Sequence, residues 1–284
     1  MPELPEVEVL VRHLAPVLEG RIIRAVEVLC VRVLAPTTAR EFERTLLGAK
    51  FLSLERRGKF LDFQLRPKGG RVPFGLLGHL GMTGRMFLQR PSQPLPKHAA
   101  VVLRLGRACF VFEDPRQFGR LTLDTRALTR LGPEPFAKDF SPGYFAAALN
   151  RSRQAIKVRL LDQSLVAGVG NIYASEALFR AGIAPRRPAC RLTAAQVAGL
   201  RRAVIHVLKE AIQCGSTLPL DFAGTGERDG HFYYGRAAGT PDYYAERLMV
   251  YDRAGQPCRI CGVPIRRCVQ AARSTFHCPH CQRR

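Results

Sequence analysis

The chain opens with Met1-Pro2-Glu3-Leu4-Pro5-Glu6-Val7-Glu8. Apolar residues recur at helical spacing from this stretch as far as Leu18, and Gly20 follows as a stop signal. The pattern predicts an amphipathic helix over residues 5–18. In the simplest interpretation, Pro2 and Pro5 only stiffen the start of that helix, because proline is favoured at the first helical position.

Pro2 also has a chemical interpretation, because removal of Met1 would leave a secondary amine at the chain terminus. An α-amino group titrates at about pH 8, so part of the population is an unprotonated nucleophile at neutral pH. A secondary amine that attacks an aldehyde-level carbon forms an iminium ion, the electron sink of Schiff-base enzymes. Glu3 follows immediately and is close enough to transfer protons. Pro2 and Glu3 are therefore candidate catalytic residues, and the rest of the chain decides between the two interpretations.

The composition points to a polyanionic partner. The chain has 284 residues, a length for which two domains are the natural expectation. Its 44 lysines and arginines exceed its 23 acidic residues, so the formal net charge is +21. This excess predicts binding to nucleic acid first and to an anionic membrane surface second. The membrane is disfavoured, because no apolar run reaches transmembrane length and the N-terminus lacks the order of a signal peptide. The spacing of the nine cysteines, which argues against disulfides, leads us to expect a cytoplasmic protein.

Four of the nine cysteines form two pairs near the C-terminus, Cys258-x2-Cys261 and Cys278-x2-Cys281. This spacing is typical of a zinc site with four thiolate ligands, which is closed and therefore structural. Cys268, His277 and His280 could compete as ligands, but each breaks the symmetric pairing. We predict one structural Zn²⁺ in a small basic module. The scattered cysteines are expected to stay reduced in the core.

The residue patterns change along the chain from strand-like to helix-like, and they predict an α+β multidomain protein. Residues 50–124 contain short runs of strand character separated by Gly or Pro clusters, which predict a β-sandwich or flattened barrel with flanking helices. Leu131-Gly132-Pro133-Glu134-Pro135 breaks this pattern, and helical runs follow. The expected organisation is a β-sandwich domain over 1–132, a hinge over 133–140, a helical domain over 141–249 with a loop over about 215–245, and a zinc module over 250–284.

Three local patterns give sharper predictions. Residues 22–34 are rich in β-branched side chains and predict a long strand or a bent pair of strands. Thr38 with Glu41, and Thr193 with Gln196, have the spacing of a capping box at the start of a helix.

Two turns of the first domain carry side chains that suit insertion into DNA. Gly78-His79-Leu80-Gly81-Met82-Thr83-Gly84 places Met82 between strands, and Glu113-Asp114-Pro115-Arg116-Gln117-Phe118-Gly119 does the same for Arg116 and Phe118. An exposed Met or Phe on a loop is usually the edge of a core. In a strongly basic protein, such side chains can instead fill the gap left by an extruded nucleotide. Lys59 heads a strand and could bind phosphate or supply a second amine.

A glycine-bracketed turn, Val166-Ala167-Gly168-Val169-Gly170-Asn171, precedes a predicted helix. It would present Asn171 and free backbone amides at a helix N-terminus, a natural phosphate site. The same glycines also suit a tight corner between helices, and no P-loop lysine follows them. Further on, seven arginines accompany a single acid, Asp252, over residues 250–284. Arg273, just before the second cysteine pair, is the best candidate there for a phosphate contact.

These motifs together resemble the bacterial formamidopyrimidine-DNA glycosylase family. The match runs through nearly the whole chain: MPELPEVE at the start, RRGKF around Lys59, HLGMTG around Met82, DPRQFG around Arg116, LGPEP at the hinge, VAGVGNIYASEALFRAGI in the helical half, and the terminal four-cysteine ribbon. Chance would rarely produce all of these in order.

The resemblance implies an N-terminal β-sandwich, a helix–two-turn–helix domain and a zinc finger. It implies that Pro2, once Met1 is removed, attacks the sugar C1′ of an oxidised purine such as 8-oxoguanine or a formamidopyrimidine. Successive β- and δ-elimination would then cut the strand, so the enzyme would be a glycosylase and abasic-site lyase of base-excision repair. By motif position, Glu3 is the acid/base partner of Pro2, and Lys59 assists at the lesion phosphate.

The resemblance also implies a partner and its contacts. The partner is double-stranded DNA that contains oxidised bases or abasic sites, and the enzyme would act on it as a monomer in the bacterial nucleoid. Met82, Arg116 and Phe118 would fill the vacated stack. Phosphates would be held by Lys157, Asn171 and Arg273.

Two departures limit the transfer, and two alternatives stay open. The family commonly has two basic residues where this chain has Arg116 and Gln117, and residues 215–250 form a longer segment than usual, so base-contacting residues there are not assigned. Endonuclease VIII-type enzymes, which remove oxidised pyrimidines, are the nearest alternative, although Leu4 favours the purine branch. A zinc-ribbon DNA-binding protein without catalysis is the alternative from another class.

Overall fold

The computed structural model describes residues 2–215 and 247–283. The predicted loop over about 215–245 lies outside the described residues, apart from Gly215. The described chain divides into two compact units, one made of residues 2 and 6–129 and the other of residues 3–5, 130–215 and 247–283. Each unit is described by itself.

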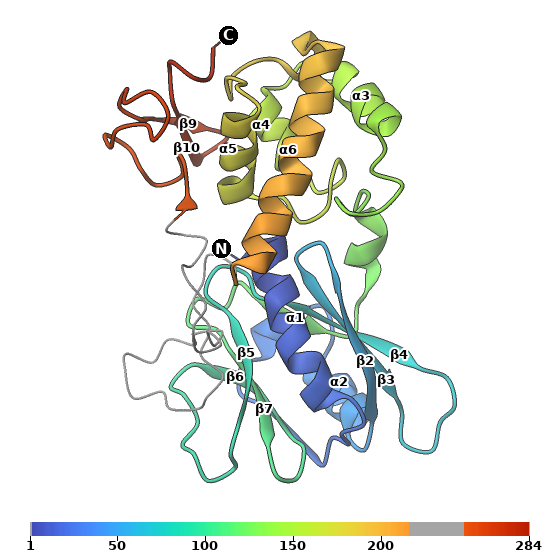
Figure 1. Ribbon diagram of the computed structural model, residues 1–284. Helices are drawn as coiled ribbons and strands as arrows, with labels where there is room; N and C mark the ends of the chain where they lie inside the picture. The colour runs from blue at the N-terminus through green and yellow to red at the C-terminus, as the bar shows by residue number, and fades with distance from the viewer. Residues whose placement is uncertain (1, 216–246, 284) are drawn as a thin grey trace. The chain divides into compact units, whose positions relative to one another are not determined.

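Two four-stranded antiparallel sheets form the body of the first unit and confirm the predicted β-sandwich (Figure 1). One sheet has the order β1-β6-β7-β5, with β1 at Ala25–Val28, β6 at Ala99–Arg104, β7 at Cys109–Glu113 and β5 at Arg85–Gln89. The other has the order β2-β3-β4-β8, with β2 at Lys50–Arg57, β3 at Phe60–Arg66, β4 at Phe74–His79 and β8 at Arg120–Thr122.

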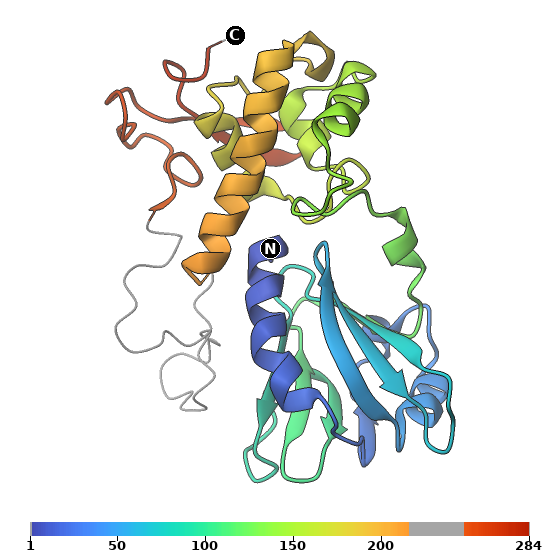
Figure 2. The ribbon, with the colours of Figure 1, turned by 45° about the vertical axis from the view of Figure 1, so that its right-hand side comes forward.

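Helix α1 (Leu4–Leu18) closes the core of this sandwich. Its apolar face buries Val7, Leu10, Leu14 and Leu18 in the same cluster as Phe63 of β3 and Phe110 of β7. The rings of Phe63 and Phe110 meet edge to face across the two sheets, with centroids 5.9 Å apart. Burial of one such side chain contributes about 1.5–3 kcal/mol. The spacing seen in the sequence therefore did predict this helix, and Figure 2 shows it running alongside both sheets.

Residues 22–34 depart from the predicted long strand. β1 covers only four of them, and a 3-10 turn, η1 (Val31–Leu34), follows. Val33 and Leu34 are both fully buried. In a strand these neighbours would point to opposite faces, whereas a helical turn can bury both on one side. Burial of adjacent apolar residues explains why the strand prediction is wrong here.

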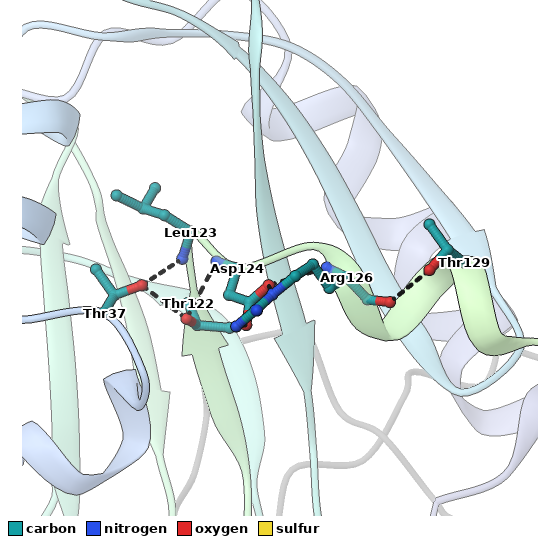
Figure 3. A network of polar contacts seen from close by, with 6 residues as sticks. All are labelled: Thr37, Thr122, Leu123, Asp124, Arg126 and Thr129. Carbon is teal, nitrogen blue, oxygen red and sulfur yellow. Dashed lines mark hydrogen bonds and ion pairs between the residues drawn. The ribbon is translucent and has the colours of Figure 1, made fainter.

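Helix α2 (Ala39–Leu46) begins as predicted, because the Thr38 hydroxyl accepts the backbone N–H of Glu41 at 3.2 Å. The neighbouring residue Thr37 ties this region to the end of β8. Its hydroxyl accepts the N–H of Leu123 at 3.0 Å and lies 2.8 Å from the Thr122 hydroxyl (Figure 3). Asp124 then pairs with Arg126 at the start of the 3-10 turn η2 (Arg126–Arg130).

The second unit is helical around one apolar core. Its elements are α3 (Pro142–Asn150), α4 (Ile156–Leu160), α5 (Asn171–Arg180), the 3-10 turn η3 (Ala189–Arg191) and α6 (Ala194–Gln213). The capping box predicted at Thr193 and Gln196 is present, with both reciprocal hydrogen bonds. Tyr173 and Leu178 of α5 pack with Leu200 and Val204 of α6 in this core.

A two-stranded hairpin, β9 (Arg266–Gln270) and β10 (Arg273–His277), completes the second unit. Phe276 packs edge to face on Tyr251, with ring centroids 5.1 Å apart, and Phe179 of α5 joins the same small cluster. The sequence had not indicated these strands, because charged residues interrupt their alternation. Within the described residues, no helix is both long and apolar enough to cross a membrane.

Candidate active site

The carboxylate of Glu3 lies at the N-terminus of α5. It accepts backbone N–H groups from Gly170 at 2.7 Å, from Ile172 at 2.9 Å and, more weakly, from Tyr173 at 3.4 Å. The first N–H groups of a helix have no partner inside the helix, and the helix dipole favours a negative charge beside them. Glu3 is only 1% exposed. The fold therefore holds this carboxylate rigidly, one residue after Pro2, which is also buried.

The glycines of the preceding turn make room for this N-terminal segment. A Cβ atom at Gly170 would lie 2.3 Å from Cδ of Glu3, and one at Gly168 would lie 2.5 Å from Cβ of Leu4. The N–H of Leu4 also donates to the carbonyl of Gly168 at 3.0 Å. The prediction of free backbone amides at this turn is therefore wrong for Gly170 and Ile172, whose amides are taken by Glu3.

Lys59 occupies the two-residue turn of the β2–β3 hairpin, where Gly58 has a φ of +60°. A two-residue hairpin requires a positive φ at its first turn position, and glycine adopts it without strain. The side chain of Lys59 is nearly buried, at 8% exposure. Its strand neighbour Phe60 stacks on His79, with centroids 4.8 Å apart.

His79 is a residue of this region that the sequence did not single out. Burial, assisted by the positive charges of Lys59 and Arg120, lowers the pKa of His79 to about 4. Its Nδ1 accepts the N–H of Gly81 at 3.1 Å, so the neutral ring carries its proton on Nε2. The one sequence signal that could have indicated His79 is its position as the first residue of the HLGMTG motif.

Met82 and Phe118 are among the exposed large apolar side chains, at 44% and 47% exposure. The guanidinium of Arg116 stacks over the Phe118 ring, 4.8 Å from its centroid. Gly81 packs against the peptide between Phe118 and Gly119, where a Cβ atom would lie 2.5 Å from the nitrogen of Gly119. The fold therefore brings the three predicted inserting side chains onto adjacent turns.

Lys157 is buried, at 1% exposure, in a set of three acceptors. Its ammonium donates to Oδ1 of Asn171 at 2.6 Å, to Oγ1 of Thr275 at 2.7 Å and to the carbonyl of Ser274 at 2.9 Å. Burial lowers its pKa to about 8, an effect that nearby Cys268 and Glu3 oppose. All three protons of the ammonium are thus engaged by protein acceptors, and the phosphate contact of Lys157 stays a prediction.

Asn171 joins α5 to the β9–β10 hairpin, because its amide nitrogen also donates to the carbonyl of Ser274 at 2.9 Å. Arg273, the residue before Ser274, is exposed at the base of the hairpin turn. That turn consists of Ala271 and Ala272, whose φ angles of +47° and +58° lie in the left-handed region. Asn171 on α5 and Arg273 on β10 therefore lie on elements that a hydrogen bond connects. A phosphate site shared by the two residues would require such a connection.

Glu176 is a second residue that the sequence did not single out. Its buried carboxylate accepts the backbone N–H groups of Met249, Val250 and Tyr251 at 2.8–3.0 Å. Burial raises the pKa of Glu176, and these hydrogen bonds oppose the rise. An acid within an otherwise apolar stretch of helix, NIYASEALF, is the signal that could have revealed it. Glu176 anchors the start of the zinc module to α5.

The thiols of Cys258, Cys261, Cys278 and Cys281 lie within 4.8 Å of one another. Two of the Sγ–Sγ distances, Cys258–Cys281 and Cys261–Cys278, are 3.9 and 3.5 Å. Four sulfurs at about 2.3 Å from a tetrahedral zinc ion lie about 3.8 Å apart, so the spacing fits Zn²⁺. Cys268, His277 and His280 do not belong to this cluster. The prediction of one structural zinc is confirmed.

Three family models match consecutive parts of the chain. The N-terminal domain of formamidopyrimidine-DNA glycosylase matches residues 1–121, and the helix–two-turn–helix domain of the same enzyme matches residues 131–220. A zinc finger found in this enzyme and in isoleucyl-tRNA synthetase matches residues 255–284.

Curated relatives match from end to end. A formamidopyrimidine-DNA glycosylase from a Synechococcus species is 42% identical, over 99% of both chains. One from Solibacter usitatus is 40% identical, over the full length of both.

Solved structures agree with these matches. Lactococcus lactis Fpg in complex with DNA that contains an N7-benzyl-Fapy-dG has a TM-score of 0.87, with 31% identity and complete coverage of both chains. The same enzyme with abasic-site DNA has a TM-score of 0.86 and 30% identity, over 99% of this chain and 100% of that one.

Proposed function

The chain belongs to the formamidopyrimidine-DNA glycosylase family, and from this premise we propose that Pro2 is its catalytic nucleophile. The protein is a base-excision-repair DNA glycosylase that acts on oxidised purines. Its partner is DNA that contains damaged or abasic sites. A zinc-ribbon protein without catalysis is disfavoured, because full-length relatives at about 40% identity are enzymes.

The geometry of Glu3 is the observation that carries this proposal. Three backbone N–H groups hold its carboxylate beside the chain terminus, so a proton acceptor is fixed one residue from the Pro2 nitrogen. Once Met1 is removed, the Pro2 nitrogen attacks C1′ of the lesion nucleotide, and the glycosidic bond to the oxidised purine breaks. Glu3 takes part in the accompanying proton transfers as acid and base. The product is an iminium ion between Pro2 and the opened sugar.

Strand cleavage follows from the same intermediate. The iminium ion acidifies the C2′ hydrogens, so loss of a proton from C2′ expels the 3′ phosphate by β-elimination. A second elimination expels the 5′ phosphate. Lys59, nearly buried at the hairpin turn beside neutral His79, is proposed to assist at the lesion phosphate.

Six further residues are proposed to contact DNA. Met82, Arg116 and Phe118 fill the space left by the extruded nucleotide, supported by their exposure on adjacent turns. Asn171 and Arg273 hold phosphates, supported by their links through Ser274. Lys157 is proposed to hold a phosphate at the same site, supported by the hydrogen bond from its ammonium to Asn171.

We also propose the finer organisation expected from the sequence. A hinge over residues 133–140 connects the N-terminal domain over 1–132 to the helical domain over 141–249, and the zinc finger occupies 250–284. Action in the cytoplasm on nucleoid DNA is proposed from the net charge of +21, which favours sequence-independent, salt-sensitive attraction to duplex DNA.

Borohydride trapping tests the mechanism. Wild-type protein mixed with an 8-oxoguanine:cytosine duplex and sodium borohydride should give a covalent complex, and peptide mass spectrometry should place the adduct on Pro2. Pro2→Gly, and an N-terminal extension that blocks the amine, should each abolish that adduct. A covalent complex that persists in both variants would contradict the assignment. A parallel thymine glycol duplex tests substrate class, since faster excision of that pyrimidine would overturn the oxidised-purine assignment.

A further inference from the structure

Two turns cross side by side from one sheet of the sandwich to the other. Residues 80–84 connect β4 to β5, and residues 114–119 connect β7 to β8. The residues that flank these turns are paired at both ends, His79 with Arg120 in one sheet and Arg85 with Glu113 in the other. The register of both sheets therefore holds the two turns alongside each other.

The backbones of the two turns are in direct contact. A Cβ atom on Gly81 would lie 2.5 Å from the nitrogen of Gly119 and 2.6 Å from the carbonyl carbon of Phe118. Real Cβ atoms essentially never approach that closely. Gly81 also has a φ of +62°, which favours glycine. Only glycine at this position allows the contact without a shift of backbone.

The carboxylate of Asp114 joins the two turns. It is 2% exposed and accepts three hydrogen bonds. One comes from the first turn, where the Thr83 hydroxyl donates to Oδ1 at 2.7 Å. Two come from the second turn, where the N–H of Arg116 donates to Oδ1 at 3.2 Å and the N–H of Gly119 donates to Oδ2 at 2.7 Å. This carboxylate therefore connects residues of both turns through hydrogen bonds.

These hydrogen bonds also bracket a strained residue. Gln117 has a φ of +55°, a conformation that is unfavourable for a side chain other than glycine. Arg116 and Gly119 lie on either side of it, and both donate to Asp114. The carboxylate thus holds the loop in the shape that stacks Arg116 on Phe118.

We propose that Asp114 is a positioning residue that makes Met82, Arg116 and Phe118 act as one preformed wedge. This inference rests on the proposed function, in which those three side chains enter the base stack. Extrusion of a nucleotide costs a few kcal/mol. A wedge that is already ordered loses less conformational entropy on insertion than three independent side chains would. The hydrogen bond from Thr83 to Asp114 links the two turns. The two hydrogen bonds to Asp114 from within residues 114–119 maintain the conformation of the second turn.

A double-mutant cycle tests the link. Single-turnover excision of 8-oxoguanine is measured for Met82→Ala, Phe118→Ala and the combined variant, first with Thr83 present and then in the T83V background. With Thr83 present, the fold-loss of excision rate in the combined variant should be at least about tenfold smaller than the product of the two single fold-losses. The reason is that either change alone already disables the same wedge. In the T83V background the two losses should multiply. Thr83→Ser, which retains the hydroxyl, should restore the non-additive behaviour.

Further variants keep the result interpretable. Asp114→Asn should lower the rate of 8-oxoguanine excision about tenfold or more. The rate at which the same variant cleaves DNA at a preformed abasic site should fall by a smaller factor. Thr129→Val, which removes an exposed hydroxyl that donates to the carbonyl of Arg126 outside both turns, should leave excision unchanged. If losses multiply in both backgrounds, or if Thr83→Val excises at the wild-type rate, the coupling is overturned. If Met82→Ala and Phe118→Ala each excise at the wild-type rate, the wedge role in the proposed function fails instead.

Discussion

The carboxylate of Glu3 receives the N–H of Gly170 at 2.7 Å, although 167 residues separate them in the chain. Gly170 has a φ of −130°, which any residue can adopt, so the requirement for glycine is one of space. The hydrogen bonds from Gly170 and Ile172 hold the carboxylate of Glu3 in a fixed position, one residue after Pro2.

Gly170→Ala is expected to displace Glu3. The added Cβ would lie 2.3 Å from Cδ of Glu3, and overpacking of this kind typically costs about 1–3 kcal/mol. We expect a lower melting temperature and a slower single-turnover excision of 8-oxoguanine. Gly199→Ala is the matched control, because nothing lies within 4 Å of its Cβ position in α6. That change should stabilise the protein by about 0.5–1 kcal/mol and leave excision unchanged. Equal behaviour of the two variants would contradict the tight fit around Glu3.

Lys157 should make stability rise with pH over a defined window. Its pKa in the folded protein is about 8, whereas its ordinary value is 10.5. Between these values the unfolded chain binds a proton that the folded chain has lost, so the free energy of unfolding increases with pH. Below pH 8 both states carry the proton, and the contribution is constant. Urea unfolding of wild type and Lys157→Met from pH 7 to about pH 10.5 should show a relative gain for wild type on the order of 1–3 kcal/mol. Parallel curves would show that the pKa of Lys157 is the same in the folded and unfolded states, which would contradict the prediction.

Loss of the zinc ion should unfold the zinc module. The module has a small apolar cluster of its own, so metal binding contributes much of its folding free energy. Wild type should contain one zinc per chain by mass spectrometry of the metal. Cys261→Ser should lose the metal and become sensitive to protease after residue 249, with weaker DNA binding. Cys190→Ser, which changes a half-buried cysteine outside the cluster, should retain the metal. Full zinc content in Cys261→Ser would exclude that thiol as a ligand.

Ala272→Gly is expected to stabilise the β9–β10 hairpin. Ala272 has a φ of +58°, and the left-handed conformation costs a residue with a Cβ roughly 1–2 kcal/mol. Glycine avoids this cost but loses about 0.5–1 kcal/mol through greater freedom in the unfolded chain. The net gain should be about 0.5–1 kcal/mol, visible as a rise in the melting temperature. Ala254→Gly, at an exposed position without positive φ, should be neutral or destabilising. If both changes lower the melting temperature, the turn is not strained.

Much of the site was predictable because its chemistry is carried by residue type and spacing. A proline after Met1 can become a secondary amine wherever the chain folds, and two CxxC pairs can hold zinc once they meet. Helix periodicity predicted α1, and a glutamine three residues after Thr193 predicted the cap at the start of α6. These features depend on neighbours in the chain, so the sequence determines them by itself.

The tertiary structure decided which groups meet across long separations. The amides after Gly168 suited a phosphate equally well, and only packing of the N-terminal segment assigned them to Glu3. Lys157 was expected to hold a phosphate, and only the tertiary structure shows that its buried ammonium donates to Thr275, 118 residues away. Asp114 acquired its link to Thr83 because two sheets pair the residues that flank both turns. No local pattern encodes such contacts, since they depend on the register and packing of distant segments.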